Sequence, residues 1–244
     1  MSVTGVVLAG GRGTRLAPLT DRTSKQLLPV GGRALIERVI GKLVQAGVED
    51  VLLVIDERHA SQFMGLLEDG GGTDLRSLAY VWQPARGSGL PSAIRQVRHH
   101  LTGDKFLVAC GDVLFEDGIK EAVDAFRVQE SGARIITVRT PDTAGYSPLR
   151  IAGDRVLGIG DKDRELHTEG HIDLGYYLYH SEVFDLIDGL GPSDRGETEI
   201  WDLNRIYVSR RDMRCSIISG WWADVGESIE TYRSVDGRYA DAGV

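Results

Sequence analysis

The chain has 244 residues, a formal net charge of −8, and 42% hydrophobic and 26% charged residues. This is the composition of an ordinary globular protein, and its acidic balance argues against nucleic-acid and membrane partners, which favour a basic face. The N-terminal apolar run is too short for a signal peptide or a membrane span, so we expect a cytoplasmic protein. With only two cysteines, Cys110 and Cys215, there is no disulfide framework, and their apolar surroundings predict buried thiols.

The first half of the sequence alternates between apolar runs typical of buried strands and segments with helical spacing of apolar residues. Strands and helices that alternate in this way imply right-handed βαβ units and a largely parallel sheet. Strands are predicted at 3–9, 48–56, 78–83 and 105–110, and helices at 34–46, 59–68, 91–101 and 118–130.

The second half begins with a predicted strand at 133–140 and then changes in character. Two segments, 147–163 and 171–180, indicate antiparallel strands, with a turn near Gly153 and Asp154. Further helices are predicted at 181–188, 197–208 and 227–236, and a strand at 214–219. Because no linker or low-complexity tract divides the chain, we expect one domain over residues 1–244.

The segment "LAGGRGTRLAPLTDRTSKQLLPV" follows the first strand, at the end of the sheet where ligands bind in open α/β folds. A dinucleotide-binding fingerprint would need a glycine in place of Leu16, and Pro18 opposes the helix that it requires. A P-loop would need a Gly-Lys-Ser/Thr sequence that is missing here. A glycine-rich phosphate loop remains, in which Arg12, Arg15 and Lys25 neutralise a polyphosphate; a solvated surface loop is the alternative.

The longer stretch "GVVLAGGRGTRLAPLTDRTSKQLLPVGGRALIE" resembles the signature of the sugar-1-phosphate nucleotidylyltransferases, in the glucose-1-phosphate thymidylyltransferase branch. "WQP", "CGD", "DKD", "GETEIWDLN" and "WADVGE" follow in the family's order, so the resemblance covers nearly the whole chain. It implies an α/β fold with a Rossmann-like, mixed but mostly parallel sheet flanked by helices, and a small antiparallel sugar-binding subdomain. Residues 1–140 would form the nucleotide-binding core and residues 141–225 the acceptor-binding part.

The activity implied by the resemblance is Mg²⁺-dependent transfer from a nucleoside triphosphate to a sugar 1-phosphate, which gives an NDP-sugar and pyrophosphate. Two polyanions must meet in this reaction, so catalysis is mainly charge neutralisation and alignment. Longer family members use a further helical segment for tetramer contacts, so the resemblance does not carry an assembly over to this chain, and a homo-oligomer is an open alternative. The resemblance assigns catalytic roles to Arg15, Lys25, Asp112 and Lys162, and nucleotide binding to Leu8, Gly10, Gly11, Gly13, Thr14, Arg15, Gln26, Gln83 and Gly89.

Two aspartates are candidate magnesium ligands. Asp112 follows a buried strand in "VACGDVLF", and Asp224 lies in "GWWADVGES" before a predicted helix. Mg²⁺ is commonly held by one or two carboxylates, with phosphates and water completing its shell. Taken alone, Asp112 could equally be a turn residue and Asp224 a helix cap.

Gln83 ends the third strand, and its family equivalent reads the uracil or thymine edge through an amide donor and acceptor. Gln26 is a second candidate for this contact. The resemblance therefore predicts dTTP or UTP as the nucleotide. The loop after Gln83 is one residue longer than the family pattern, which affects contacts near Gly87 and Gly89.

The acceptor residues implied by the resemblance are Tyr146, Ser147, Asp161, Lys162, Asp173 and Gly175. Several depart from the glucose pattern: Asp161 replaces a glutamate, Ser147 a glycine, and Asp173 a small apolar residue. A site built around one set of hydroxyls rejects analogues strongly. We therefore expect a modified sugar or a cyclitol or aminosugar 1-phosphate, unless Asp161 and Asp173 point into solvent or pair with arginines.

Two other functional classes remain open. A non-catalytic nucleotide-sugar-binding paralogue would be expected to lose the metal aspartates or the phosphate lysines, and the chain keeps Lys25, Asp112, Lys162 and Asp224. A glycosyltransferase would need a metal-binding Asp-x-Asp, but Leu114 stands at the second position after Asp112.

Overall fold

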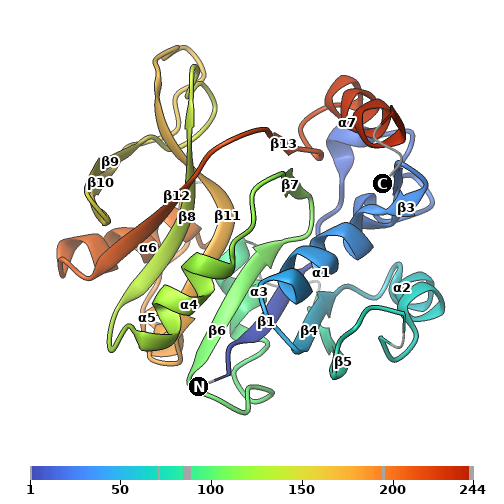
Figure 1. Cartoon of the computed structure of the whole chain (residues 1–244), viewed down its shortest axis with the longest axis horizontal. Helices are drawn as coiled ribbons and strands as arrows, with labels where there is room; N and C mark the ends of the chain where they lie inside the picture. The colour runs from blue at the N-terminus through green and yellow to red at the C-terminus, as the bar shows by residue number, and fades with distance from the viewer. Residues whose placement is uncertain (1, 71, 85–88, 194–195, 242–244) are drawn as a thin grey trace.

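The computed structural model describes residues 2–70, 72–84, 89–193 and 196–241 (Figure 1). A nine-stranded mixed sheet runs through the molecule in the order β5-β4-β1-β6-β11-β8-β12-β10-β9. Helices cover both of its faces, which confirms the predicted mixed α/β fold. The strands are β1 (Thr4–Leu8), β4 (Asp50–Ile55), β5 (Ser77–Trp82), β6 (Lys105–Cys110), β8 (Ala133–Thr140), β9 (Leu149–Ala152), β10 (Arg155–Ile159), β11 (Gly170–His180) and β12 (Met213–Ile218).

One half of the sheet is parallel and the other is mixed. Strands β5, β4, β1 and β6 are parallel to their neighbours. Strand β11 is antiparallel to both β6 and β8, whereas β8 and β12 are parallel. The β9–β10 hairpin turns at Gly153 and Asp154, as predicted, and extends the edge of the same sheet, because β10 pairs with β12 and β9 with β11.

The helices form two layers. One layer packs on the face that holds Leu53 and Tyr176, and the other on the face that holds Val54 and Tyr177. The predicted helix at 91–101 is shorter than expected, because it ends at Arg95 and continues as turns. The first layer contains α1 (Leu35–Gln45), α2 (Ala60–Leu67), α4 (Lys120–Val128) and α7 (Ile229–Asp241), and the second α3 (Leu90–Arg95), α5 (Val183–Asp188) and α6 (Ile200–Ser209).

Short elements that the sequence analysis did not predict shape the edge where the parallel strands end. Strands β7 (Val113–Phe115) and β13 (Trp222–Asp224) form a small antiparallel pair, with Asp224 opposite Val113. The long loop after β1 contains two 3₁₀ turns and a hairpin: η1 (Thr14–Leu16), η2 (Lys25–Leu27), β2 (Pro29–Val30) and β3 (Arg33–Ala34). Because Asp112 directly precedes β7, the β7–β13 pairing brings Asp112 and Asp224 together.

In the part of the chain that the structure describes, no helix combines the length and the apolar character needed to cross a bilayer.

Candidate active site

The four parallel strands all end at one edge of the sheet, and a cleft of about 790 Å³ opens there. This is the position that the fold favours for a ligand, because loops after parallel strands converge at their carboxyl ends. The cleft gathers most of the predicted nucleotide residues, including Leu8 and Thr14. Its walls comprise Leu8, Gly10, Gly11, Arg12, Thr14, Lys25, Gln26, Asp56, Glu57, Arg58, Gln83, Pro84, Gly89, Leu90, Ala93, Cys110, Asp112 and Glu197.

The glycine-rich turn after β1 forms one wall of the cleft. Gly13 has a φ of 64°, in the left-handed region that glycine adopts without strain, and begins η1. The hydroxyl of Thr20 donates to the Gly13 carbonyl at 2.8 Å and holds the turn closed. A Cβ atom at Gly11 would stand 3.6 Å from Lys25 Cε, so the lysine stem runs alongside exposed backbone. The turn thus offers backbone amides and an ammonium group to the same ligand.

Gln83 lies against the same turn. A Cβ atom at Gly10 would stand only 2.3 Å from Gln83 Oε1, so the amide occupies the space that a larger residue at position 10 would fill. The Gln83 backbone N–H donates to the Ile55 carbonyl at 2.8 Å and fixes the base of the side chain. Gly89 has a φ of 94°, and a Cβ there would meet the Thr198 carbonyl at 1.9 Å. Gly87, singled out in the sequence, lies outside the described residues.

Gln26 is buried beneath the ends of β1 and β6. Its side chain is 2% exposed, and its Oε1 accepts a hydrogen bond from Ser24 Oγ at 2.6 Å. A Cβ atom at Gly111 would stand 3.0 Å from Gln26 Cγ, so this glycine permits the close packing. With the carbonyl oxygen occupied, the Gln26 amide nitrogen is the end that remains for a ligand.

Lys25, Asp112 and Asp224 converge on one point, although they come from three separate segments. A Cβ atom at Gly226 would stand 2.8 Å from Asp112 Oδ2, 2.9 Å from Lys25 Nζ and 3.2 Å from Asp224 Oδ1. Lys25 Nζ forms an ion pair with Asp112. The Val225 N–H donates to the Asp112 carbonyl and the Gly226 N–H to Asp224 Oδ1, both at 2.9 Å. The backbone of residues 224–226 therefore holds both aspartates in place.

The three groups strongly affect one another's charge. Burial raises the pKa of Asp224 to about 6, the charge of Asp112 adds to this rise, and Lys25 and Arg15 oppose it. For Lys25, burial favours a lower pKa, but Asp112 and then Asp224 overcome it and raise the pKa above the ordinary value. Lys25 thus stays a cation between two carboxylates.

The two carboxylates fit a Mg²⁺ ion that is shared with a ligand, rather than a metal ion held by protein side chains alone. Across the described residues, no group of three or more histidine, cysteine or acidic side chains could hold a metal ion by itself. Asp112 and Asp224 provide hard oxygen donors, and Gly226 lets both approach closely, because a Cβ atom there would crowd them. This is the donor set of a Mg²⁺ site that is completed by phosphates and water.

On the acceptor side, Tyr146 packs edge-on against Trp222, with ring centroids 5.5 Å apart. Ser147 is 4% exposed, and its Oγ has no hydrogen-bond partner among the described residues. Lys162 does not contact the carboxylate pair; its Nζ lies 5.0 Å from the centroid of the Trp201 ring. Trp201 belongs to α6, so the predicted phosphate lysine lies against this helix.

The structure gives different results for the two unusual acceptor carboxylates. Asp161 is 89% exposed and pairs with Arg205 at 2.5 Å, which is one of the alternatives that the sequence left open. Asp173 is half-buried: its Oδ1 accepts hydrogen bonds from Tyr177 Oη at 2.7 Å and from the Gly175 N–H at 3.0 Å.

The prediction of two buried thiols is correct for Cys215 and wrong for Cys110. Cys215 is 3% exposed within the sheet. Cys110 ends β6, is partly exposed and lines the cleft. The apolar run before Cys110 suggested burial, but a residue at the carboxyl end of a parallel strand faces the ligand site.

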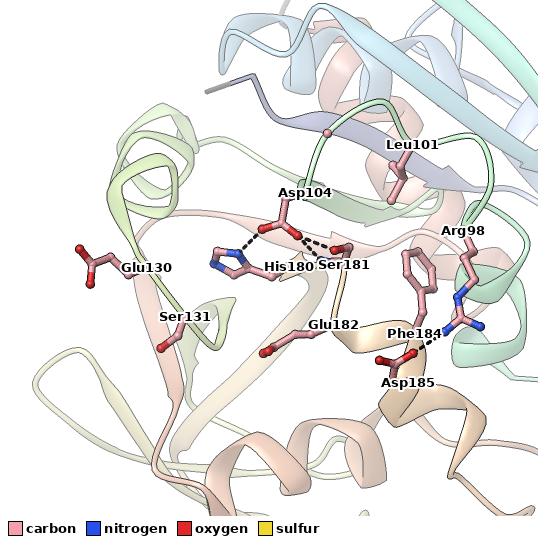
Figure 2. Close-up of a pocket in the computed structure, with 11 residues that line it drawn as sticks. Arg98, Leu101, Asp104, Glu130, Ser131, His180, Ser181, Glu182, Phe184 and Asp185 are labelled. Carbon is pink, nitrogen blue, oxygen red and sulfur yellow. Dashed lines mark hydrogen bonds and ion pairs between the residues drawn. The ribbon is translucent and has the colours of Figure 1, made fainter.

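A second hollow, of about 570 Å³, lies where β6 begins and β11 ends (Figure 2). Asp104 accepts hydrogen bonds there from Ser181 and, at 2.8 Å, from His180 Nδ1, and these contacts lower the Asp104 pKa. Arg98 pairs with Asp185 at 2.8 Å. Asp104 and Arg98 are thus engaged by neighbouring side chains, whereas His180 Nε2 is buried without a hydrogen-bond partner among the described residues.

Sequence reasoning missed several residues of the cleft. Asp56 and Arg58 follow β4 and form an ion pair, and Glu197 lines the same cleft. Gly226 was also missed, although a glycine two residues after a candidate metal ligand is a usable signal for close approach. Asp56 could have been found because it ends a predicted strand at the ligand edge.

Comparisons with known proteins show which family the chain resembles over its length. A family model described as nucleotidyl transferase matches residues 4–239. A glucose-1-phosphate thymidylyltransferase of Actinoplanes sp. is 32% identical over 95% of this chain and 77% of its own length. The enzyme of the same name from Xanthomonas campestris pv. campestris (strain B100) is 33% identical over 91% of this chain and 76% of its own length.

A solved structure shows the same architecture. The protein from Bacillus anthracis, assigned as a glucose-1-phosphate thymidylyltransferase and crystallised with a sucrose, superimposes with a TM-score of 0.90 at 30% identity. The match covers 98% of this chain and 96% of that one. The glycine-rich turn, the lysine and the paired aspartates thus stand in a fold and a sequence context shared over nearly the full chain: this protein belongs to the nucleotidyl transferase family.

Proposed function

We propose that this protein transfers a nucleotidyl group from a nucleoside triphosphate, with dTTP or UTP favoured, to the phosphate of a sugar 1-phosphate or a related aminosugar or cyclitol phosphate. The products are an NDP-sugar and pyrophosphate. The observation that carries the proposal is the convergence of Lys25, Asp112 and Asp224 around Gly226, beside the glycine-rich turn. Relatives named glucose-1-phosphate thymidylyltransferase support the same reaction class.

In the proposed reaction, an oxygen of the acceptor phosphate attacks the α-phosphorus of the triphosphate. The bond from the α-phosphorus to the bridging oxygen breaks, and pyrophosphate leaves with the electron pair. Because both reactants are anions, the protein contributes mainly alignment and positive charge. Lys25, Arg15 and the amides of Gly11 and Gly13 provide these next to the cleft, and Lys162 is assigned to the acceptor phosphate.

Asp112 and Asp224 would hold Mg²⁺, which supplies positive charge to phosphate oxygens when it is bound. Each aspartate provides an oxygen donor in a fixed position at the end of the glycine-rich turn. Lys25 keeps this pair of carboxylates partly neutralised in the structure described, since it forms an ion pair with Asp112. Burial and the charge of Asp112 raise the pKa of Asp224 to about 6. A cation beside the two aspartates opposes this rise and favours the state in which both are ionised.

The base preference rests on Gln83. Its amide lies over Gly10 at the side wall of the cleft, where its N–H would donate to the carbonyl oxygen of a pyrimidine and its oxygen would accept from the ring N–H. The Gln26 amide nitrogen, buried nearby, is a second donor.

Pyrophosphate release, measured with five triphosphates and a panel of sugar 1-phosphates in the presence of Mg²⁺, tests the proposal. We expect release with dTTP or UTP. A non-catalytic binding paralogue would bind nucleotide and release no pyrophosphate, and a clear preference for GTP or ATP would refute the base assignment.

A further inference from the structure

Asp173 lies on β11 at an irregularity of the strand, beside the residues assigned to the acceptor. The register of β11 against β8 shifts between Asp173 and Tyr177. Gly175, within this shift, has a φ of 71°, and a Cβ there would stand 2.8 Å from Cys110 Sγ. Cys110 lines the cleft, so the irregular segment passes directly over its wall. Bulges next to active sites commonly redirect a side chain, and here the side chain is Asp173.

The carboxylate of Asp173 is held in one orientation. Its Oδ1 accepts both the Tyr177 hydroxyl, at 2.7 Å, and the Gly175 N–H, at 3.0 Å. Tyr177 is 2% exposed and packs in the core, so its hydroxyl has a fixed position and restrains the Asp173 carboxylate. Among the described residues, Oδ2 of Asp173 receives no hydrogen bond. One oxygen is thus used for positioning and the other is left for a ligand.

Asp173 also lacks a cationic partner. Two other acidic residues of the acceptor part are paired: Asp161 with Arg205 at 2.5 Å, and Asp154 with Arg214 at 2.6 Å. Within the described ranges Asp173 forms no ion pair. A half-buried carboxylate that only neutral groups contact is costly, and such groups in folded proteins usually have a cation beside them. Because no cationic side chain of the described residues pairs with Asp173, a cationic group on a bound ligand would compensate its charge.

Asp173 is near the acceptor residues as well as the cleft. Burial raises the pKa of Tyr146, and the charges of Glu227, Asp224 and Asp173 add to the rise. The Asp173 carboxylate is therefore close enough to the Tyr146 hydroxyl to affect its charge.

We propose that Asp173 determines acceptor specificity, and that its free oxygen selects a sugar or cyclitol phosphate that carries a protonated amino group. The inference rests on the proposed function and adds the substrate class. A carboxylate only accepts hydrogen bonds, so its partner must be a donor. An ammonium group supplies both donors and the compensating charge, and a hydroxyl supplies only a donor.

The test compares kcat/KM for glucose 1-phosphate with kcat/KM for glucosamine 1-phosphate and for the analogues with the amino group at C3, C4 or C6. We expect the protein to favour at least one amino acceptor by about tenfold or more, the range of a charge-assisted hydrogen bond. Asp173→Asn keeps the acceptor for Tyr177 and removes the charge. It should reduce that preference by about 10- to 100-fold through the KM of the amino acceptor, with a smaller change in kcat/KM for glucose 1-phosphate.

Two further variants separate this role from a structural one. Tyr177→Phe frees the carboxylate to rotate and should weaken the preference severalfold. Asp154→Asn removes a carboxylate of the β9–β10 turn that pairs with Arg214, and should leave the preference intact. Glucose 1-phosphate turning over as well as every amino analogue, or an unchanged preference in Asp173→Asn, overturns the inference and leaves the proposed function standing. Absence of pyrophosphate release with every acceptor overturns both.

Discussion

The nucleotide side and the acceptor side of the site are built by different means. On the nucleotide side, the glycine-rich turn, Gly10 beneath Gln83 and Gly226 between two aspartates are positions where the absence of a side chain makes room. On the acceptor side, side chains are bound to one another, as in the ion pair of Asp161 with Arg205 and the hydrogen bond of Tyr177 to Asp173.

This difference separates a general requirement from a specific one. Every nucleoside triphosphate presents the same phosphates, which backbone amides, a lysine and a divalent cation can bind whatever the base or sugar. Acceptors differ in individual hydroxyl and amino groups, and these require side chains in fixed orientations. Substitutions on the nucleotide side should therefore lower activity with every acceptor. Substitutions on the acceptor side should first change which acceptor is preferred and only then lower kcat.

The largest expected effect comes from removing the lysine of the nucleotide side. Lys25→Ala takes away the charge between Asp112 and Asp224, and we expect kcat to fall by about 10³-fold, as for the loss of one strong electrostatic contact to a transition state. Steady-state pyrophosphate release measures it. The control is Lys120→Ala, a surface lysine that pairs with Asp124. A kcat within threefold of the unaltered protein would remove Lys25 from the mechanism.

The next effect concerns the metal. Asp224→Asn keeps the size of the side chain and removes half of the predicted Mg²⁺ site, so activity should fall by about 10²-fold and need more Mg²⁺ for half-maximal rate. EDTA should abolish the activity of the unaltered protein, and added Mg²⁺ should restore it. The control is Asp185→Asn, an exposed partner of Arg98. Full activity in EDTA would contradict the assignment of both aspartates.

A methyl group at Gly10 tests the close approach on the nucleotide side. Gly10→Ala places a Cβ 2.3 Å from Gln83 Oε1, so the amide must move, and KM for dTTP should rise about tenfold with kcat nearly unchanged. The control is Gly41→Ala in helix α1, where a Cβ meets nothing within 4 Å. There we expect unchanged kinetics and a gain of up to about 1 kcal/mol in stability. An unchanged KM in Gly10→Ala would mean that Gln83 does not read the base.

The smallest effect lies on the acceptor side. Arg205→Ala breaks an ion pair with the largely exposed Asp161, so the free energy of unfolding should change by less than about 1 kcal/mol. The freed carboxylate should alter the acceptor KM a few-fold and leave the KM for dTTP as it was. Thermal denaturation and two-substrate kinetics measure the two quantities. An equal change in both KM values would show that the two sides are not separable.

Periodicity predicted most of the fold because its central elements are long and locally consistent. The apolar runs that became β1, β4 and β6, and the helical spacing in α1, lie close to their predicted positions. Strands β7 and β13 escaped prediction, because three residues carry no periodic signal and their partners are over a hundred residues apart. Yet this pair sets the distance between Asp112 and Asp224.

The site was predictable where residue type alone defines a role. Glycines, Lys25 and the strand-end Gln83 could be placed at the ligand edge from the order of strands. The partners of Asp161 and Asp173 could not, because Arg205 and Tyr177 meet them through tertiary packing and strand irregularity. A carboxylate in a sequence does not reveal whether another side chain has already neutralised it.

A crystal structure of the protein with dTTP and Mg²⁺ tests the central claim most directly. We predict the triphosphate along Gly11 and Lys25, with the metal ion bound by both Asp112 and Asp224. Nucleotide bound elsewhere, for example in the hollow beside Asp104 and His180, or a metal ion that contacts neither aspartate, would contradict the account.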